Sequence, residues 1–220
     1  MSERKSYSNE IQNFDQVSGL SLDRIKALSD GVFAIALTLL VLDISIPARN
    51  EIIHETDLAQ AFGKLTPKLL TYFLSFVTLG IFWTAHTSQF HFIEKSDRNF
   101  NWINLFFLLF VTIMPFTTAF LSEFIDFKFA VGLYWLNLFL IGIMLFWTLD
   151  YCDRNHFLKN HLTKESPVIR VMIKRGLIAQ SLYVAGALLS FISTYISIAA
   201  LISVQLFFVF GSFGKLRKGR

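Results

Sequence analysis

Residues 24–43 read RIKALSDGVFAIALTLLVLD, a polar entry followed by a nearly uninterrupted apolar run. As an α-helix, the 19 residues from Leu28 to Ile46 would extend over about 28 Å, at about 1.5 Å per residue. That length crosses the hydrocarbon core of a bilayer, so the stretch predicts a membrane-spanning helix. Two acids, Asp30 and Asp43, lie inside or at the ends of this helix, and a carboxylate in lipid is costly unless it faces protein or water. We therefore expect other parts of the protein or water to receive them.

The composition of the whole chain indicates the same class of protein. Apolar residues make up 54% of the 220 residues, phenylalanine occurs 25 times and the mean hydropathy is +0.52. A water-soluble domain of this size could not bury so much apolar surface, whereas a polytopic membrane protein exposes it to lipid. The single cysteine, Cys152, excludes an internal disulfide and a cysteine-based zinc cluster. The histidines also lack the spacing of metal ligands, so no cofactor is predicted.

Six apolar spans are predicted along the chain. The final uncharged run, 177–213, is 37 residues long, which is too long for one span and fits two spans joined by a tight turn near residues 193–197. The sequence thus predicts an all-α, polytopic integral membrane protein. It has an N-terminal arm at 1–23, a six-span domain at 24–213 and a basic tail at 214–220. The predicted spans cover residues 28–46, 67–85, 101–121, 129–149, 177–193 and 197–213.

The distribution of basic residues predicts the orientation. With six spans, the side that holds both termini carries 16 of the 20 lysines and arginines, and the opposite side carries 4. Basic loops stay on the cytoplasmic side, so both termini are predicted to be cytoplasmic in a multi-pass protein of the cell membrane. The same asymmetry explains the net charge of +4, so no nucleic-acid partner is predicted. The basic tail is expected to contact lipid headgroups.

Polar residues from three predicted spans fall at one depth. Ser29 and Asp30 begin the first span, His86 ends the second and Asn104 lies near the start of the third, with Trp83 beside them. Such groups can form a hydrogen-bonded network between helices, in which Asp30 is expected to pair with His86 and Asn104. The alternative is that they are ordinary interfacial residues, with the tryptophan in an aromatic belt.

One face of the first span is a continuous aliphatic stripe centred on Ile35. At about 100° per residue, its other members fall within roughly 60° of Ile35. They are Leu28, Gly31, Thr38, Leu39, Leu42 and Ile46. An aliphatic stripe on a membrane helix commonly faces lipid or another helix, so the stripe alone does not identify a function.

Several motifs resemble the transmembrane protein 175 family of potassium channels. The first span carries Arg24-x-x-x-Leu28-Ser29-Asp30, where the family has Arg-x-x-x-Phe-Ser-Asp. The matches that follow are Phe82-Trp83-x-x-His86, Asn104-Leu105 and Met114-Pro115-Phe116. Leu28 stands where the family has phenylalanine. The resemblance extends over about residues 24–120 and is only architectural beyond.

The resemblance implies a homotetramer in which the first helix of each subunit lines a central pore. Carried over by position, Ile35 would form the narrowest ring, Leu39 and Leu42 would lie above it and Thr38 would add hydroxyl groups. A hydrophobic ring of this kind blocks ions by excluding water. Asp43 would lie at the outer mouth and attract cations, or it is an ordinary interfacial carboxylate.

The resemblance also assigns a structural and gating network to the polar residues of the first three spans. Its members here would be Arg24, Ser29, Asp30, Trp83, His86 and Asn104.

The predicted function is therefore a potassium-preferring cation channel, with permeant potassium ions in place of a cofactor. No Thr-Val-Gly-Tyr-Gly segment occurs, so a carbonyl selectivity filter is not expected. No hydrolase, nucleotide-binding or metalloprotease motif occurs either, so an enzyme is not predicted. The expected partners are other copies of the chain, membrane lipids, and potassium and other monovalent cations. Two alternatives remain: a small secondary transporter that uses Asp30 or Asp43 for proton or cation coupling, and a non-conducting membrane scaffold.

Overall fold

The computed structural model describes residues 21–45, 48–49, 52–159 and 162–216, and this part of the chain is all-α. Most of the predicted N-terminal arm, residue 46 of the first predicted span and the last four residues of the basic tail lie outside the described residues. Two short 3₁₀ helices, η1 (Leu40–Asp43) and η4 (Leu189–Phe191), directly continue α2 and α7. The α-helices are α2 (Leu22–Leu39), α3 (Glu55–Lys64), α4 (Thr66–His91), α5 (Arg98–Glu123), α6 (Lys128–Arg154), α7 (Pro167–Leu188) and α8 (Thr194–Leu216).

Four of these segments are long and apolar enough to cross a membrane. They are the combined α2 and η1 helix, α4, α5 and α6. Helix α8 has a shorter apolar stretch, Thr194–Val209, and the first half of α7 carries Arg170, Lys174 and Arg175. The protein is thus an integral membrane protein by the length and composition of its helices, and the full set of six spans stays a prediction.

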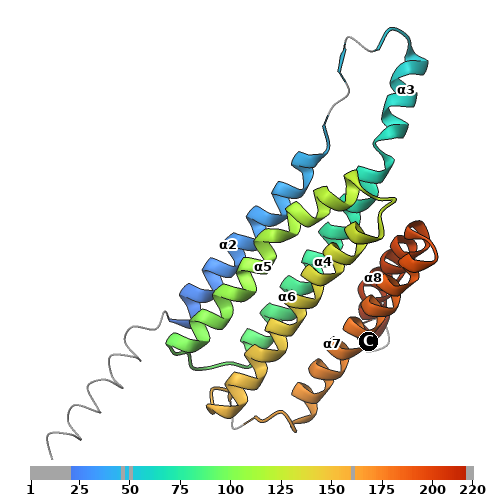
Figure 1. The fold of residues 1–220 in the computed structure, drawn as a ribbon. Helices are drawn as coiled ribbons and strands as arrows, with labels where there is room; N and C mark the ends of the chain where they lie inside the picture. The colour runs from blue at the N-terminus through green and yellow to red at the C-terminus, as the bar shows by residue number, and fades with distance from the viewer. Residues whose placement is uncertain (1–20, 46–47, 50–51, 160–161, 217–220) are drawn as a thin grey trace, which may run out of the picture.

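The long helices form one bundle, in which α5 lies beside α2 (Figure 1). Helix α5 packs against α2, α4 and α6, while the hairpin of α7 and α8 packs against α6 and α4. Helix α2 runs along one edge of the bundle and the α7–α8 hairpin lies at the opposite edge. The core between them is filled by large apolar side chains, among them Phe33, Phe107, Leu138 and Leu201. One side of α2 therefore remains without a neighbour from its own chain.

The turn between α7 and α8 comes at Ile192 and Ser193, at the beginning of the predicted 193–197 turn. The two helices lie close together because Gly186 has no side chain. A Cβ atom at this position would come within 2.9 Å of Leu201. The Ser197 hydroxyl donates to the Gly186 carbonyl at 2.6 Å across the same contact. The hairpin is thus a packed unit rather than two independent helices.

The connections α4–α5 and α6–α7 meet at one end of the bundle. The backbone N–H of Glu94 donates to Phe157 O at 2.9 Å, and that of Lys159 donates to Phe92 O at 2.8 Å. Ile93 and Leu158, which lie between these bonds, are both buried. The two loops are therefore on the same side, as expected for loops that follow an even number of spans.

A cluster of buried hydroxyl groups ties four helices together inside the bundle. Ser75 on α4 donates to the Tyr134 hydroxyl on α6 at 3.1 Å, and Thr118 on α5 donates to Ser75 at 2.7 Å. Gln205 on α8 donates to the Thr78 hydroxyl on α4. All five side chains are buried, so each bond replaces one that water cannot provide there. None of these five residues was predicted from the sequence as a site residue.

Candidate functional site on the first helix

Helix α2 has one buried and one exposed face. The buried residues recur every three or four positions, so they form a single stripe along the helix. This stripe packs against α4 and α5. Its members are Ile25, Ser29, Phe33 and Ala36, and it continues into η1 with Leu40.

The four residues predicted to form a pore constriction all lie on the exposed face. The exposed fraction is 60% for Ile35, 44% for Leu39 and 72% for Leu42. Thr38 is also exposed, and its hydroxyl donates to the Ile35 carbonyl at 2.8 Å. A row of exposed aliphatic residues on a membrane helix has to meet lipid, a second copy of the chain or a pore.

The 3₁₀ winding of η1 changes the direction of the residues at the end of α2. In a 3₁₀ helix, residues three apart lie directly above one another. Leu42 therefore continues the exposed row above Leu39, whereas Asp43 falls on the side of the buried Leu40. The Asp43 carboxylate, expected at the outer mouth of the pore, faces α5 in the structure.

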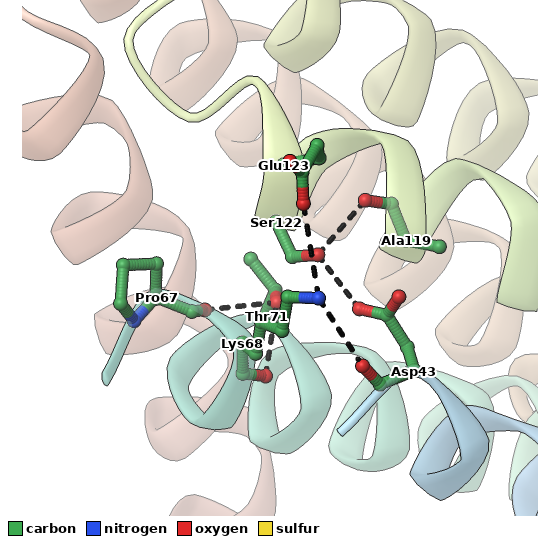
Figure 2. A network of polar contacts seen from close by, with 7 residues as sticks. All are labelled: Asp43, Pro67, Lys68, Thr71, Ala119, Ser122 and Glu123. Atoms are coloured by element: carbon green, nitrogen blue, oxygen red, sulfur yellow. Dashed lines mark hydrogen bonds and ion pairs between the residues drawn. The ribbon is translucent and has the colours of Figure 1, made fainter. Parts of the chain in front are cut away.

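The Asp43 carboxylate is held by neighbours from its own chain. The Ser122 hydroxyl on α5 donates to Asp43 Oδ2 at 2.7 Å, and Lys68 Nζ on α4 donates to the Asp43 backbone carbonyl at 3.4 Å (Figure 2). Neither Lys68 nor Ser122 was predicted from the sequence as a site residue. Their depth could have revealed them, because Lys68 begins the second predicted span and Ser122 follows the third, at the end where Asp43 lies.

The structure brings together Ser29, His86 and Asn104 from the predicted network. His86 Nε2 and Asn104 Oδ1 are 2.9 Å apart, and Asn104 Nδ2 donates to Ser29 Oγ at 3.2 Å. Because an amide oxygen only accepts, the imidazole carries its hydrogen on Nε2 in this arrangement. The ring of His86 also stacks on Phe107, with 4.8 Å between ring centroids. All of these side chains are buried, so the bonds link α2, α4 and α5 within one subunit.

Asp30 makes a different contact from the one that was predicted. It accepts a hydrogen bond from Trp83 Nε1 at 2.8 Å, and both side chains are exposed. The expected pairing of Asp30 with His86 and Asn104 differs from the structure, where Ser29 rather than Asp30 bonds to Asn104. The physical reason is that successive helix residues point about 100° apart, so Ser29 and Asp30 cannot both face α5.

Arg24 lies in the first turn of α2, and its side chain is exposed. Within the described ranges, it makes no hydrogen bond or ion pair with another side chain. The structure therefore does not bring Arg24 into contact with the other predicted network residues. In the same described part of the chain, no group of three or more histidine, cysteine, aspartate or glutamate side chains is arranged to hold a metal ion.

Known proteins match the chain in sequence and in structure. A family model described as the endosomal/lysosomal potassium channel TMEM175 matches residues 24–115. A potassium channel from Chamaesiphon minutus is 30% identical over 200 residues, which cover 86% of this chain and 94% of that channel. The crystal structure of a lysosomal potassium-selective channel TMEM175 homolog from the same organism superimposes with a TM-score of 0.74 at 28% identity. The superimposed region covers 87% of this chain and 97% of the chain in that crystal structure.

A relative with a different named activity matches a shorter part. The endosomal/lysosomal proton channel TMEM175 of Gallus gallus is 37% identical over 129 residues. The match covers 56% of this chain but only 26% of that much longer relative.

Proposed function

The chain belongs to the TMEM175 family of ion channels, and on this premise we propose that it forms a potassium-preferring cation channel. The observation that supports a pore along α2 is the exposed row of Ile35, Leu39 and Leu42, with the hydroxyl of Thr38 beside it. The opposite face of α2 is fully covered by α4 and α5, so the helix has one free side to offer to a pore.

The proposed assembly is a homotetramer with four copies of α2 around a central axis. One chain supplies only one such helix, so a ring requires several copies. In this ring, Ile35 makes the narrowest level and acts as a hydrophobic gate, and Leu39 and Leu42 continue the apolar wall toward the outer end. The network of Ser29, His86 and Asn104 fixes the orientation of α2 within each subunit, and with it the direction of the gate residues.

The proposed ion is potassium, and the selectivity comes from the width and lining of the ring. The relative matched over nearly its full length is named a potassium channel, whereas the vertebrate relative matched over a quarter of its length is named a proton channel. No carbonyl filter is available in the sequence, so we expect a modest preference for potassium over sodium. Proton conduction is the second candidate, because of the name of that vertebrate relative.

The proposal further includes six spans, with the hairpin of α7 and α8 providing the last two and with both termini in the cytoplasm. The close packing of α7 against α8 supports a hairpin that crosses the membrane twice. The contact between the α4–α5 and α6–α7 connections supports their placement on one side. The residue bounds 1–23, 24–213 and 214–220 stay the proposed division of the chain.

Purified protein in planar bilayers tests the function. Discrete unitary currents are expected, whereas saturable flux without unitary steps would indicate a transporter and the absence of both would indicate a scaffold. Reversal potentials measured with potassium on one side and sodium on the other, and again across a proton gradient, identify the permeant ion.

Substitution of Ile35 tests the gate in the same recordings. Each Ile35 side chain buried in a closed ring contributes about 1.5–3 kcal/mol, so Ile35→Ala should both widen the ring and destabilise the shut state. We expect larger leak currents and a potassium-to-sodium permeability ratio closer to one. The matched control is Ile143→Ala, an exposed isoleucine on α6, which should change neither quantity. Equal behaviour of the two variants would show that α2 does not line the pore.

A further inference from the structure

A charge cluster lies where the end of α2 meets α4 and α5 (Figure 2). Lys68 Nζ is 3.7 Å from Glu123 Oε2 and 3.4 Å from the backbone carbonyl of Asp43. The Lys68 side chain is 24% exposed and that of Glu123 is 65% exposed. One ammonium group therefore links the Glu123 carboxylate on α5 to the backbone carbonyl of Asp43, at the end of the helix that carries the exposed aliphatic row.

Ser122 sets the direction of the Asp43 carboxylate. Its hydroxyl lies 2.7 Å from Asp43 Oδ2 and 2.8 Å from the Ala119 carbonyl of its own helix. A hydroxyl has one hydrogen to donate, so these two acceptors share it. Asp43 is held against α5 by this bond, while Ser122 keeps an acceptor in its own helix if the carboxylate moves away. The carboxylate is thus fixed close behind the exposed row without being buried as an unpaired charge.

The balance of charge in the cluster depends on Lys68. Asp43 and Glu123 contribute two negative charges and Lys68 contributes one positive charge, so each subunit has a net charge of −1 at this position. Without the ammonium group, each subunit would present −2. Fixed charges of this kind change the local concentration of permeant cations, and the effect is strong at low ionic strength and weak at high ionic strength.

We propose that Lys68 is a positioning residue for ion conduction: it fastens the outer end of the α2–η1 helix to α4 and limits the cation attraction exerted by Asp43 and Glu123. This inference rests on the proposed function, because it requires α2 to line the pore. Lys68 does not touch the permeant ion. It acts through the two acidic residues whose field the ion meets.

Unitary potassium conductance of the full-length channel in about 20 mM and about 1 M KCl tests the proposal. The measured quantity is the ratio of the low-salt to the high-salt conductance. A purely structural role would not change this ratio, because salt screens charge and not packing. For Lys68→Met, we expect the ratio to rise by at least about twofold, since one positive charge is lost from each of four subunits and the losses act together in weakly screened water.

Three further variants make the result specific. Glu123→Gln removes one negative charge and should lower the ratio, and Lys68→Arg keeps the cation and should leave it near that of the unmodified channel. Lys64→Met makes the same charge change as Lys68→Met on the exposed helix α3, where Lys64 has no ion-pair partner within the described residues. It should change the ratio by much less than Lys68→Met.

The proposal is overturned if Lys68→Met leaves the ratio unchanged or matches Lys64→Met. It is also overturned if Glu123→Gln raises the ratio. This second measurement tests the proposal even if the Lys68→Met protein does not assemble. These outcomes differ from failure of the proposed function, in which the unmodified protein itself gives no unitary current.

Discussion

Replacing Asn104 by alanine should destabilise the subunit more than any other single change in the polar network. Asn104 is the central residue, because its Nδ2 donates to Ser29 on α2 and its Oδ1 lies 2.9 Å from His86 Nε2 on α4. Asn104→Ala removes both bonds at once. Ser29 keeps a partner, since its hydroxyl also donates to the Ile25 carbonyl at 2.9 Å. His86 Nε2 is left buried without its partner.

The cost can be worked out from these contacts. Hydrogen bonds between membrane helices contribute about 0.6 kcal/mol each on average, so two lost bonds amount to about 1.2 kcal/mol. A buried polar group left without a partner adds about 1–3 kcal/mol. The expected loss is therefore about 2–4 kcal/mol of the free energy of unfolding. For a chain of this length it corresponds to a fall in Tm of about 5 °C or more.

Thermal unfolding of the purified protein in detergent or lipid nanodiscs measures this loss. The matched control is Thr112→Ala on the same helix, because Thr112 is exposed and its hydroxyl bonds only to Leu109 O in its own helix. The control should lose less than about 0.5 kcal/mol. If Asn104→Ala is no less stable than Thr112→Ala, the bonds between Ser29, Asn104 and His86 do not hold the three helices together, and the reasoning is refuted.

Two other predictions concern the separate Asp30 contact and the orientation in the membrane. Asp30→Ala removes only the half-exposed bond from Trp83, so it should cost about 1 kcal/mol or less in the same unfolding assay; a loss as large as that of Asn104→Ala would show that Asp30 belongs to the buried network. A cysteine introduced by Glu55→Cys should react with a membrane-impermeant reagent from outside, and one introduced by Lys159→Cys only from inside, with little background from the buried Cys152. The opposite labelling pattern would overturn the proposed orientation.

Helical phase alone grouped the aliphatic residues that share one face of α2. Leu28, Ile35, Leu39 and Leu42 were placed on one face by the 100° period, and all four are exposed in the structure. Residue depth likewise predicted that Ser29, His86 and Asn104 would lie at one level. Phase and depth succeed here because both depend only on regular helix geometry, which the sequence pattern carries directly.

The details that the sequence did not predict depend on departures from that regularity. The change from α to 3₁₀ winding at Leu40 turns Asp43 toward α5, and nothing in the apolar run of this stretch indicates it. Depth gives the level of a side chain but not its direction, so it could not decide whether Ser29 or Asp30 meets Asn104. Helix α7 begins at Pro167, before the predicted span at 177, because a helix continues through charged residues outside the lipid.

The bond from Gln205 to Thr78 also has a consequence for how the protein is made. The two residues are 127 positions apart, and Gln205 belongs to α8, the last helix within the described residues. A ribosome releases α4, α5 and α6 into the membrane before α8 emerges, so the buried hydroxyl cluster stays incomplete until α8 is made. Helix α8 then supplies the Gln205 amide, which donates a hydrogen bond to the Thr78 hydroxyl and completes the cluster. Packing of α4 in its final form therefore depends on a hairpin that enters the membrane after it.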